Sequence, residues 1–356
     1  MFSCFLRKGA SPLQGYPGYS LCYRIPLRIL QNAFCSKISG DFPIENKQDK
    51  VEQIRILLRN YGLSDIQIST ISQMHPKVFR FHPQNVILPK LKFLSSIGLS
   101  SDILHKIIVN NPWLLQRSLE NKLIPCYNLL KNVPISNKDI VRIIKRNSRI
   151  LGTNVEKIAA NVDAFRQMGV PQSSISFVMV NHPSLVLLNC EKLKRCVEET
   201  LSLGFNRLNT LFVQAVYVLC GSSKETWENK VKVYKSFGLS ETEVQSAFRA
   251  HPLCMRLSVE KISRGMDFFV NEMGWSPTIV ARWPAALFYH LEKRIIPRCQ
   301  VIKVLMQKGL VKEHQTLMSF LGTTEEQFLD KYVSKYMDVL PELRDIYRAG
   351  MIFKNN

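Results

Sequence analysis

The sequence predicts an all-α protein, a solenoid of about eight helical repeats between residues 51 and 340. The first observation is a glycine followed fourteen positions later by a proline, in a pattern that recurs every 32–36 residues. The second is a set of apolar columns in register with this pattern. The pairs are Gly62/Pro76, Gly98/Pro112, Gly169/Pro183 and Gly238/Pro252, and further glycines continue the period at Gly204, Gly274 and Gly309.

The apolar columns predict two helices in each repeat. Apolar residues stand four positions before the repeat marker and again six and nine positions after it, which is the spacing of one helix face. The first column is Leu58, Leu94, Leu130, Phe165, Tyr234, Val270 and Leu305. The second is Ile68, Leu104, Ile140, Ile175, Val244 and Val280, with Thr210 as the exception. The third is Ile71, Ile107, Ile143, Val178, Val213 and Ala247.

Local signals give the order of elements within a repeat. The glycine is expected to end the first helix, since it adopts the left-handed C-cap conformation without steric cost. A second helix begins at once, and Ser64 with Gln67 predicts a capping box at its start. Ser240 with Glu243 predicts another. The later proline is expected to end the second helix, because proline biases the preceding residue away from the helical conformation.

Some repeats depart from the pattern. Pro134 stands where a glycine is due. Ser148 and Leu219 occupy the place of the proline in the third and fifth repeats. In the repeat of Gly274, the proline Pro284 comes after only ten residues.

The charge of the chain favours a polyanionic partner. The formal net charge is +20 and the isoelectric point is about 9.6. Residues 1–40 hold five of the basic residues and no acid, which leaves +15 for the rest of the chain. Nucleic acid is the commonest partner of so basic a protein.

The ends of the chain differ from its middle. Residues 1–40 are basic, contain serine and lack acids, which is typical of an organelle transit peptide. We therefore expect a transit peptide at 1–40, a repeat domain at 41–340 and a C-terminal tail at 341–356. The mitochondrion is the first expected destination and the chloroplast is the alternative.

Signals for other classes of protein are missing from the sequence. It has no apolar stretch long enough to cross a membrane, no Gly-rich phosphate loop, no HExxH and no nucleophile elbow. The nine cysteines are scattered without a CxxC pair, so we expect buried small apolar residues rather than disulfides or zinc ligands. The sequence predicts no enzyme activity, no cofactor and no metal site.

Three histidines precede a proline of the pattern. A metal or catalytic set would have to bring together His75, His182 and His251, but they fall at equivalent positions of separate repeats. Asn111 and Trp283 occupy the same position in other repeats. We therefore interpret this position as a turn residue that packs at the end of the second helix.

Basic residues gather where a repeat fold would align them. One set forms a stripe on a predicted helix, opposite Ile140, Ile143 and Ile144. The candidate nucleic-acid-binding residues are Lys138, Arg142, Lys145 and Arg149 in this stripe, with Arg146 beside it; Lys192, Lys194, Arg195, Lys293, Arg294 and Arg298 in two further clusters; and Arg80, Arg117 and Arg256 shortly after a proline of the pattern. Matching repeat positions project from matching faces of a solenoid, so a row of arginines would follow a phosphate backbone.

The proline-containing stretches resemble those of the mitochondrial transcription termination factor (mTERF) family, most of all its plant organellar branch. The resemblance covers roughly residues 50–340 and is carried by the stretches His75–Phe79, Asn111–Leu115, His182–Val186 and His251–Met255. It implies a curved, left-handed solenoid whose mTERF-like units each hold two α-helices and a short 3₁₀ turn. It also implies a basic concave face that binds nucleic acid and a role in organelle gene expression.

Three functions remain as alternatives. The first is binding of organellar double-stranded DNA with a role in transcription termination or regulation. The second is an organellar RNA-binding factor for intron splicing, RNA processing or ribosome assembly, and the third is a protein-binding helical adaptor. The net charge of +15 outside the first 40 residues favours a nucleic acid as the partner. A second expected partner is the organellar transcription or splicing machinery. We expect a monomer without membrane contact, because a solenoid buries its core between its own repeats.

Overall fold

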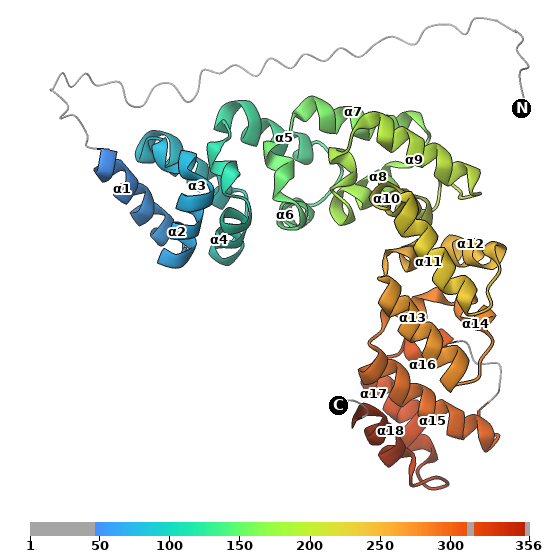
Figure 1. Cartoon of the computed structure of the whole chain (residues 1–356). Coiled ribbons are helices and arrows are strands. Elements are labelled where there is room, and N and C mark those ends of the chain that lie inside the picture. The colour runs from blue at the N-terminus through green and yellow to red at the C-terminus, as the bar shows by residue number, and fades with distance from the viewer. Residues whose placement is uncertain (1–46, 312–316, 353–356) are drawn as a thin grey trace, which may run out of the picture. The chain divides into compact units, whose positions relative to one another are not determined.

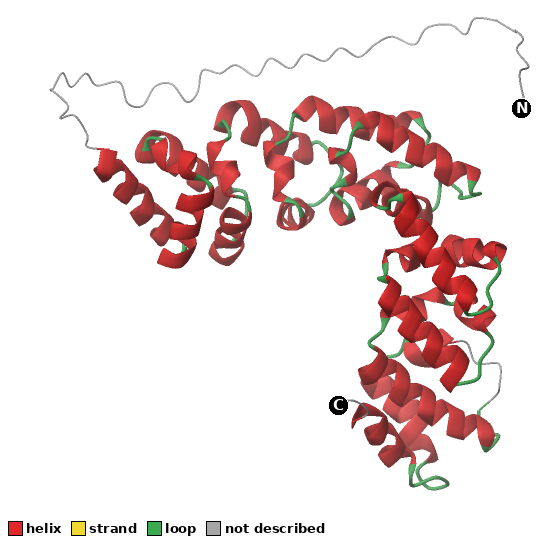
Figure 2. Cartoon of the chain, viewed as in Figure 1, coloured by secondary structure: helices red, strands yellow, loops and turns green. Residues whose placement is uncertain are grey.

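The computed structural model describes residues 47–311 and 317–352, and every regular element within them is a helix (Figure 2). The predicted all-α class is confirmed. The transit peptide expected at residues 1–40 lies outside the described residues. No helix in the described part of the chain is long and apolar enough to cross a membrane.

The repeats follow one another along the chain (Figure 1). The first helices of the repeats are α1 (Lys47–Asn60), α3 (Leu88–Ser96), α5 (Ile124–Lys131), α7 (Val155–Gln167), α9 (Cys190–Ser202), α11 (Lys224–Ser236), α13 (Val259–Asp267) and α15 (Ile296–Gln307). The second helices are α2 (Asp65–Met74), α4 (Ser101–Asn110), α6 (Asn137–Arg146), α8 (Gln172–Asn181), α10 (Thr210–Gly221), α12 (Glu241–Ala250) and α14 (Pro277–Arg282).

Short helices connect the repeats. The 3₁₀ helices that follow second helices are η1 (Pro76–Arg80), η3 (Pro112–Gln116), η5 (Ser148–Gly152), η6 (Leu185–Leu187), η7 (Pro252–Arg256) and η9 (Pro284–Phe288). Turns of π-helix adjoin first helices at η2 (Pro83–Ile87), η4 (Leu119–Leu123), η8 (Phe268–Glu272) and η10 (Leu291–Ile295). The end of the chain holds α16 (Leu317–Leu321), α17 (Glu325–Phe328), η11 (Leu329–Val333), η12 (Ser334–Tyr336) and α18 (Leu343–Ile352).

The glycines of the pattern end the first helices as predicted. All seven have φ between 69 and 92°, which is the left-handed region that glycine enters without steric cost. The second helices begin at the predicted caps. Ser64 and Ser240 each form a capping box with the residue three positions on, Gln67 and Glu243.

The prolines end the second helices and begin the 3₁₀ helices. His75, before Pro76, has φ −132° and ψ 56° and lies outside the helical region. The third repeat keeps this turn without a proline, because Asn147 accepts a hydrogen bond from the Arg149 N–H at 3.3 Å. The fifth repeat has no such residue around Leu219, so α10 continues to Gly221 and no 3₁₀ helix follows it.

The helices form two layers with the 3₁₀ helices along one edge. First helices contact neighbouring first helices, as in α5, α7 and α9, and second helices contact second helices from α6 through α14. Between them, the apolar residues of the predicted columns are buried, with Leu94 and Ile143 at 0% exposure, except Val270, which is partly buried. The 3₁₀ helices also touch in succession, η1 with η3, η3 with η5, and η7 with η9, and α10 contacts η7. We call the six 3₁₀ helices that follow second helices the 3₁₀ row, within which η1, η3 and η5 form one run of contacts and η7 and η9 another.

A side chain of the first helix donates a hydrogen bond to the end of the 3₁₀ helix in several repeats. These donors stand eight residues before the repeat marker. Lys90 Nζ donates to the Leu115 carbonyl at 2.7 Å, and Lys230 Nζ donates to the Met255 carbonyl at 2.7 Å. At the same position, Asn161 Nδ2 donates to the carbonyls of Val186 and Leu188, and Cys126 Sγ donates to that of Thr153. These bonds satisfy carbonyls that would otherwise be buried without a partner.

The last helix corrects the expected C-terminal boundary. Residues 343–352, assigned to a tail from the sequence, form α18, which packs against α15. Leu343 is fully buried and Tyr347 is 5% exposed. The helix covers the apolar face of α15, which has no further repeat to pack against.

We predict that Leu94→Ala lowers the free energy of unfolding by about 2–5 kcal/mol, because it leaves a cavity in a buried column. Leu208→Ala is the matched control, since Leu208 is 68% exposed, and it should change stability by less than about 0.5 kcal/mol. Urea unfolding followed by circular dichroism measures both. Equal effects of the two substitutions would contradict the assigned packing.

Candidate nucleic-acid interface

The predicted basic stripe lies on α6 and continues into η5. Lys138, Arg142, Lys145 and Arg149 are exposed, while the isoleucines on the opposite face of α6 are buried. Arg142 forms an ion pair with Asp139 at 3.3 Å, in which the arginine side chain keeps 55% of its exposure. Such an exposed pair contributes little to stability, so the guanidinium remains available to a ligand.

The 3₁₀ row adds basic residues to this surface and no acidic ones. None of its six helices contains Asp or Glu. Arg80 ends η1, Arg117 follows η3, Arg149 lies in η5 and Arg256 ends η7, and all four are exposed. Arg80, Arg117 and Arg149 belong to η1, η3 and η5, which touch in succession, so these three lie along one edge, whereas Arg256 lies at η7, which contacts α10 and η9. With no acid within the 3₁₀ helices themselves, these arginines give the row a positive potential.

Two of the predicted arginines also make contacts between repeats. Arg146 Nη1 donates to the Asn181 carbonyl at the end of α8 at 3.0 Å. Arg256 Nη1 donates to the Gly221 carbonyl at the end of α10 at 3.3 Å. Each bond uses one N–H of a group that has five, so these arginines stabilise the contact between repeats and keep donors for a phosphate.

The cluster on α9 lies in the other layer. Lys192, Lys194 and Arg195 are exposed, and Lys194 lies 3.5 Å from the Glu191 carboxylate. Since α9 is a first helix and α6 is a second helix, the structure does not bring this cluster onto the face of the α6 stripe.

The expectation for Arg298 is corrected. Arg298 is 2% exposed, and its Nη1 donates to the carbonyls of Phe320 and Thr323 at 2.7 and 2.8 Å. It therefore stabilises the end of the repeat array, and its side chain is not accessible to a ligand. Arg294 is half-buried and donates to the Leu321 carbonyl at 2.9 Å, whereas Lys293 is exposed.

One basic residue of the row was not among those selected from the sequence. Lys77 is exposed on η1, directly after Pro76. Arg149 stands at the same place in its repeat, directly after Ser148. Aligning the repeats on the first residue of the 3₁₀ helix would have found this match.

Two of the three histidines before the prolines, His182 and His251, pack against the next repeat as predicted. The His182 ring stacks on Tyr217 of the next repeat, with centroids 4.0 Å apart and planes 22° apart. The His251 ring meets Phe288 of its next repeat edge to face at 5.0 Å. Burial lowers the pKa of His182 to about 4, with smaller contributions from the charges of Arg146 and Arg256. His182 is therefore neutral at physiological pH.

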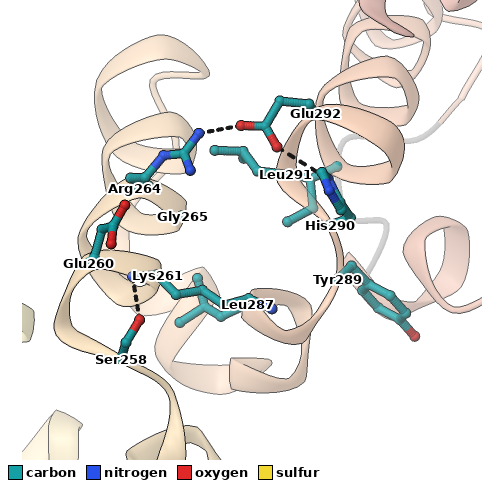
Figure 3. A pocket seen from close by; sticks show the side chains of 11 residues that line it. Ser258, Glu260, Lys261, Arg264, Gly265, Leu287, Tyr289, His290, Leu291 and Glu292 are labelled. Atoms are coloured by element: carbon teal, nitrogen blue, oxygen red, sulfur yellow. Dashed lines mark hydrogen bonds and ion pairs between the residues drawn. The ribbon is translucent and has the colours of Figure 1, made fainter. Parts of the chain in front are cut away.

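A cavity of about 270 Å³ opens between α13 and η10 (Figure 3). Figure 3 shows Glu292 between Arg264 and His290, and the His290 Nδ1 lies 3.1 Å from the Glu292 carboxylate. Burial would raise the pKa of Glu292, but a backbone N–H and the Arg264 guanidinium outweigh it and hold the pKa below its usual value. Lys261 Nζ donates to the Phe288 carbonyl at 2.9 Å. Arg264 and Lys261 thus have partners within the protein, and Glu292 places an acid in the cavity, whereas the 3₁₀ row contains none.

The fold and the basic edge define a helical-repeat protein with an elongated surface suited to a polyanion. The mTERF family model matches residues 56–219 and 210–329, and the chain belongs to this family. Three relatives from Arabidopsis thaliana are similar along most of the chain. They are the mitochondrial transcription termination factor MTERF15 (24% identity, 92% of this chain and 73% of the relative), the mitochondrial transcription termination factor MTEF18 (19%, 86% and 59%) and the chloroplastic transcription termination factor MTERF8 (17%, 84% and 58%). The chain thus spans less than two thirds of the length of the last two.

We predict that His182 makes the protein less stable in acid. Its pKa is about 4 in the folded protein and near 6.5 when unfolded, so the unfolded state binds the proton more tightly. This contribution to stability is complete above pH 6.5 and is lost as the pH falls toward 4. Urea midpoints of the wild type and His182→Gln should therefore converge or cross between pH 7 and pH 4.5. Parallel midpoint profiles would contradict the assigned pKa.

Proposed function

We propose that this protein binds double-stranded DNA of an organelle through the α6 stripe and the 3₁₀ row, and regulates transcription there. In this proposal the lysines and arginines neutralise successive phosphates of the duplex. A protein held along the duplex obstructs the polymerase, which would produce termination. Phosphate contacts of this kind fix position and affinity, and sequence preference requires additional contacts with base edges.

The observation that carries this proposal is the absence of acid from the 3₁₀ row together with its exposed arginines. Arg80, Arg117, Arg149 and Arg256 recur at the edge of separate repeats rather than at one local site. Positive charges on separate repeats fit the repeating phosphates of a duplex better than they fit a protein partner, whose charges have no fixed period. The relatives' names as transcription termination factors support the same proposal.

The proposed location is the mitochondrion. Two of the three relatives are named mitochondrial and one chloroplastic. The basic, acid-free residues 1–40 would direct the chain to the organelle. Fusing residues 1–40 to a fluorescent protein tests this, and chloroplast fluorescence would contradict the mitochondrial assignment.

We predict that binding depends steeply on salt. If six to ten phosphates are contacted, affinity for duplex DNA should fall by roughly 10³–10⁵ between 50 and 200 mM salt. The measurement is fluorescence anisotropy with the full chain on organellar duplex DNA, with single-stranded DNA and structured RNA as competitors. Tighter binding to RNA would contradict the choice of duplex DNA and support an RNA-processing role. A flat salt profile would contradict electrostatic binding altogether.

We also predict that the two layers differ in their effect on binding. The triple substitution of Arg142, Lys145 and Arg149 to Gln should weaken binding and reduce the slope of log K against log salt by about 2.7. The matched control replaces Lys192, Lys194 and Arg195 by Gln. It removes the same three charges from α9, in the other layer.

The control separates the interface from net charge. It should leave the slope nearly unchanged, because the α9 cluster lies outside the proposed interface. Equal losses in the two triple variants would show that total charge, rather than the α6 stripe, determines binding. Circular dichroism confirms that both variants fold.

A further inference from the structure

Arginines at the 3₁₀ row and in the last repeat lie over aromatic rings. The distance from the guanidinium carbon to the ring centroid is 5.2 Å for Arg117 over Trp113, 5.0 Å for Arg256 over Tyr217 and 4.3 Å for Arg294 over Tyr289. Two of these arginines, Arg117 and Arg256, belong to the proposed interface. A guanidinium over an aromatic face is held by the ring quadrupole while its N–H groups stay directed outward in its own plane.

The ring beneath Arg256 comes from the preceding repeat and is itself fixed. Tyr217 lies in α10, and the His182 ring of the repeat before stacks on it at 4.0 Å. The backbone at Gly221 also fits the guanidinium closely. A Cβ there would lie only 2.7 Å from Arg256 Nη1, which donates to the Gly221 carbonyl. The side chain of Arg256 is therefore held at both its ring and its N–H end.

The ring beside Arg117 is fixed in a similar way by different residues. Trp113 Nε1 donates to Asn111 Oδ1 at 3.2 Å, and Asn111 Nδ2 donates to Ser148 Oγ of the next repeat at 2.7 Å. Any side chain at Gly152 would collide with the Trp113 ring. The same arrangement, an arginine on a ring that is itself fixed between repeats, thus occurs twice with unrelated residues.

A fixed arginine loses less freedom when it binds a phosphate. A free arginine side chain has many rotamers, and immobilising them opposes binding. When a ring already holds the guanidinium at the edge of the array, that loss has occurred on folding. The ring thereby raises affinity without touching the ligand.

We propose that Tyr217 and Trp113 are positioning residues of the nucleic-acid interface, each holding an arginine of the 3₁₀ row ready for a phosphate. This inference rests on the proposed function, since it assigns how that surface reaches its affinity. It differs from a purely structural role in one measurable way. The effect of removing the ring must disappear when the arginine is absent.

A double-mutant cycle tests this dependence. The four proteins are the wild type, Tyr217→Leu, Arg256→Gln and the double variant, each as the full chain, with binding to duplex DNA measured from 50 to 200 mM salt. Tyr217→Leu should weaken binding about two- to fivefold, the size of one exposed cation–π contact. Its salt slope should stay unchanged because Arg256 can still neutralise a phosphate, whereas Arg256→Gln should lower the slope by about 0.9.

The double variant decides the question. It should bind as Arg256→Gln binds, and Tyr217→Phe, which restores the ring, should restore affinity. Equal weakening by Tyr217→Leu in the presence and absence of Arg256 would overturn the inference, because the tyrosine would then act through the fold alone. The same cycle with Trp113→Leu and Arg117→Gln repeats the test at the second site.

The two levels of the proposal fail in different ways. If the wild type does not bind duplex DNA at 50 mM salt, the proposed function fails and the positioning role fails with it. If the wild type binds and both cycles are additive, only the positioning role is wrong. Thermal unfolding of each single variant excludes loss of the fold as the cause of weaker binding.

Discussion

The repeats depend on a donor from the first helix that reaches the end of the 3₁₀ helix. A 3₁₀ helix leaves its last carbonyls without a partner, and an unpaired buried carbonyl costs about 1–3 kcal/mol. Lys90 and Lys230 satisfy such carbonyls with a charged donor, although burial lowers the pKa of both lysines. Asn161 does so with a neutral amide. These bonds hold the 3₁₀ helix against the first helix of its own repeat, and so they fix where the arginines at its end emerge.

The sequence predicts the parts of this fold that follow local rules. A glycine such as Gly98 has to enter the left-handed region to end its helix, and a serine such as Ser64 has to accept a hydrogen bond at the next start, so both carry a signature in one or two letters. The first-helix side chains that donate to the end of the 3₁₀ helix have no such signature in the sequence. Lysine, asparagine and cysteine occupy one structural position, and their acceptor is backbone, which a sequence does not display.

The candidate interface was predicted less completely, because the sequence does not show which charged side chains are exposed and which are buried. Arg142 and Arg298 both stand in helices with apolar neighbours, and nothing local separates them. Arg142 is exposed, whereas α15 carries Arg298 beneath the last helices and buries it. The division of the basic clusters between two layers likewise depends on contacts between repeats. Only the recurrence of arginine after the prolines, as at Arg80 and Arg256, was visible from the period itself.

The position of these arginines argues for a role in binding in addition to the contact between repeats that Arg256 makes. Acids such as Asp139 in the first turn of α6, and cations such as Lys145 and Arg146 in its last turn, stabilise the helix through its dipole and need no ligand to explain them. Arg117 and Arg256 lie instead just before the start of the next helices, which begin at Leu119 and Val259. A cation at the positive end of a helix dipole is unfavourable by itself, and in these two helices Glu120 and Glu260 in the first turn offset it. A phosphate at this place would be attracted by the arginine and by the N–H groups of the helix N-terminus together, so the same position offers two favourable interactions to the ligand.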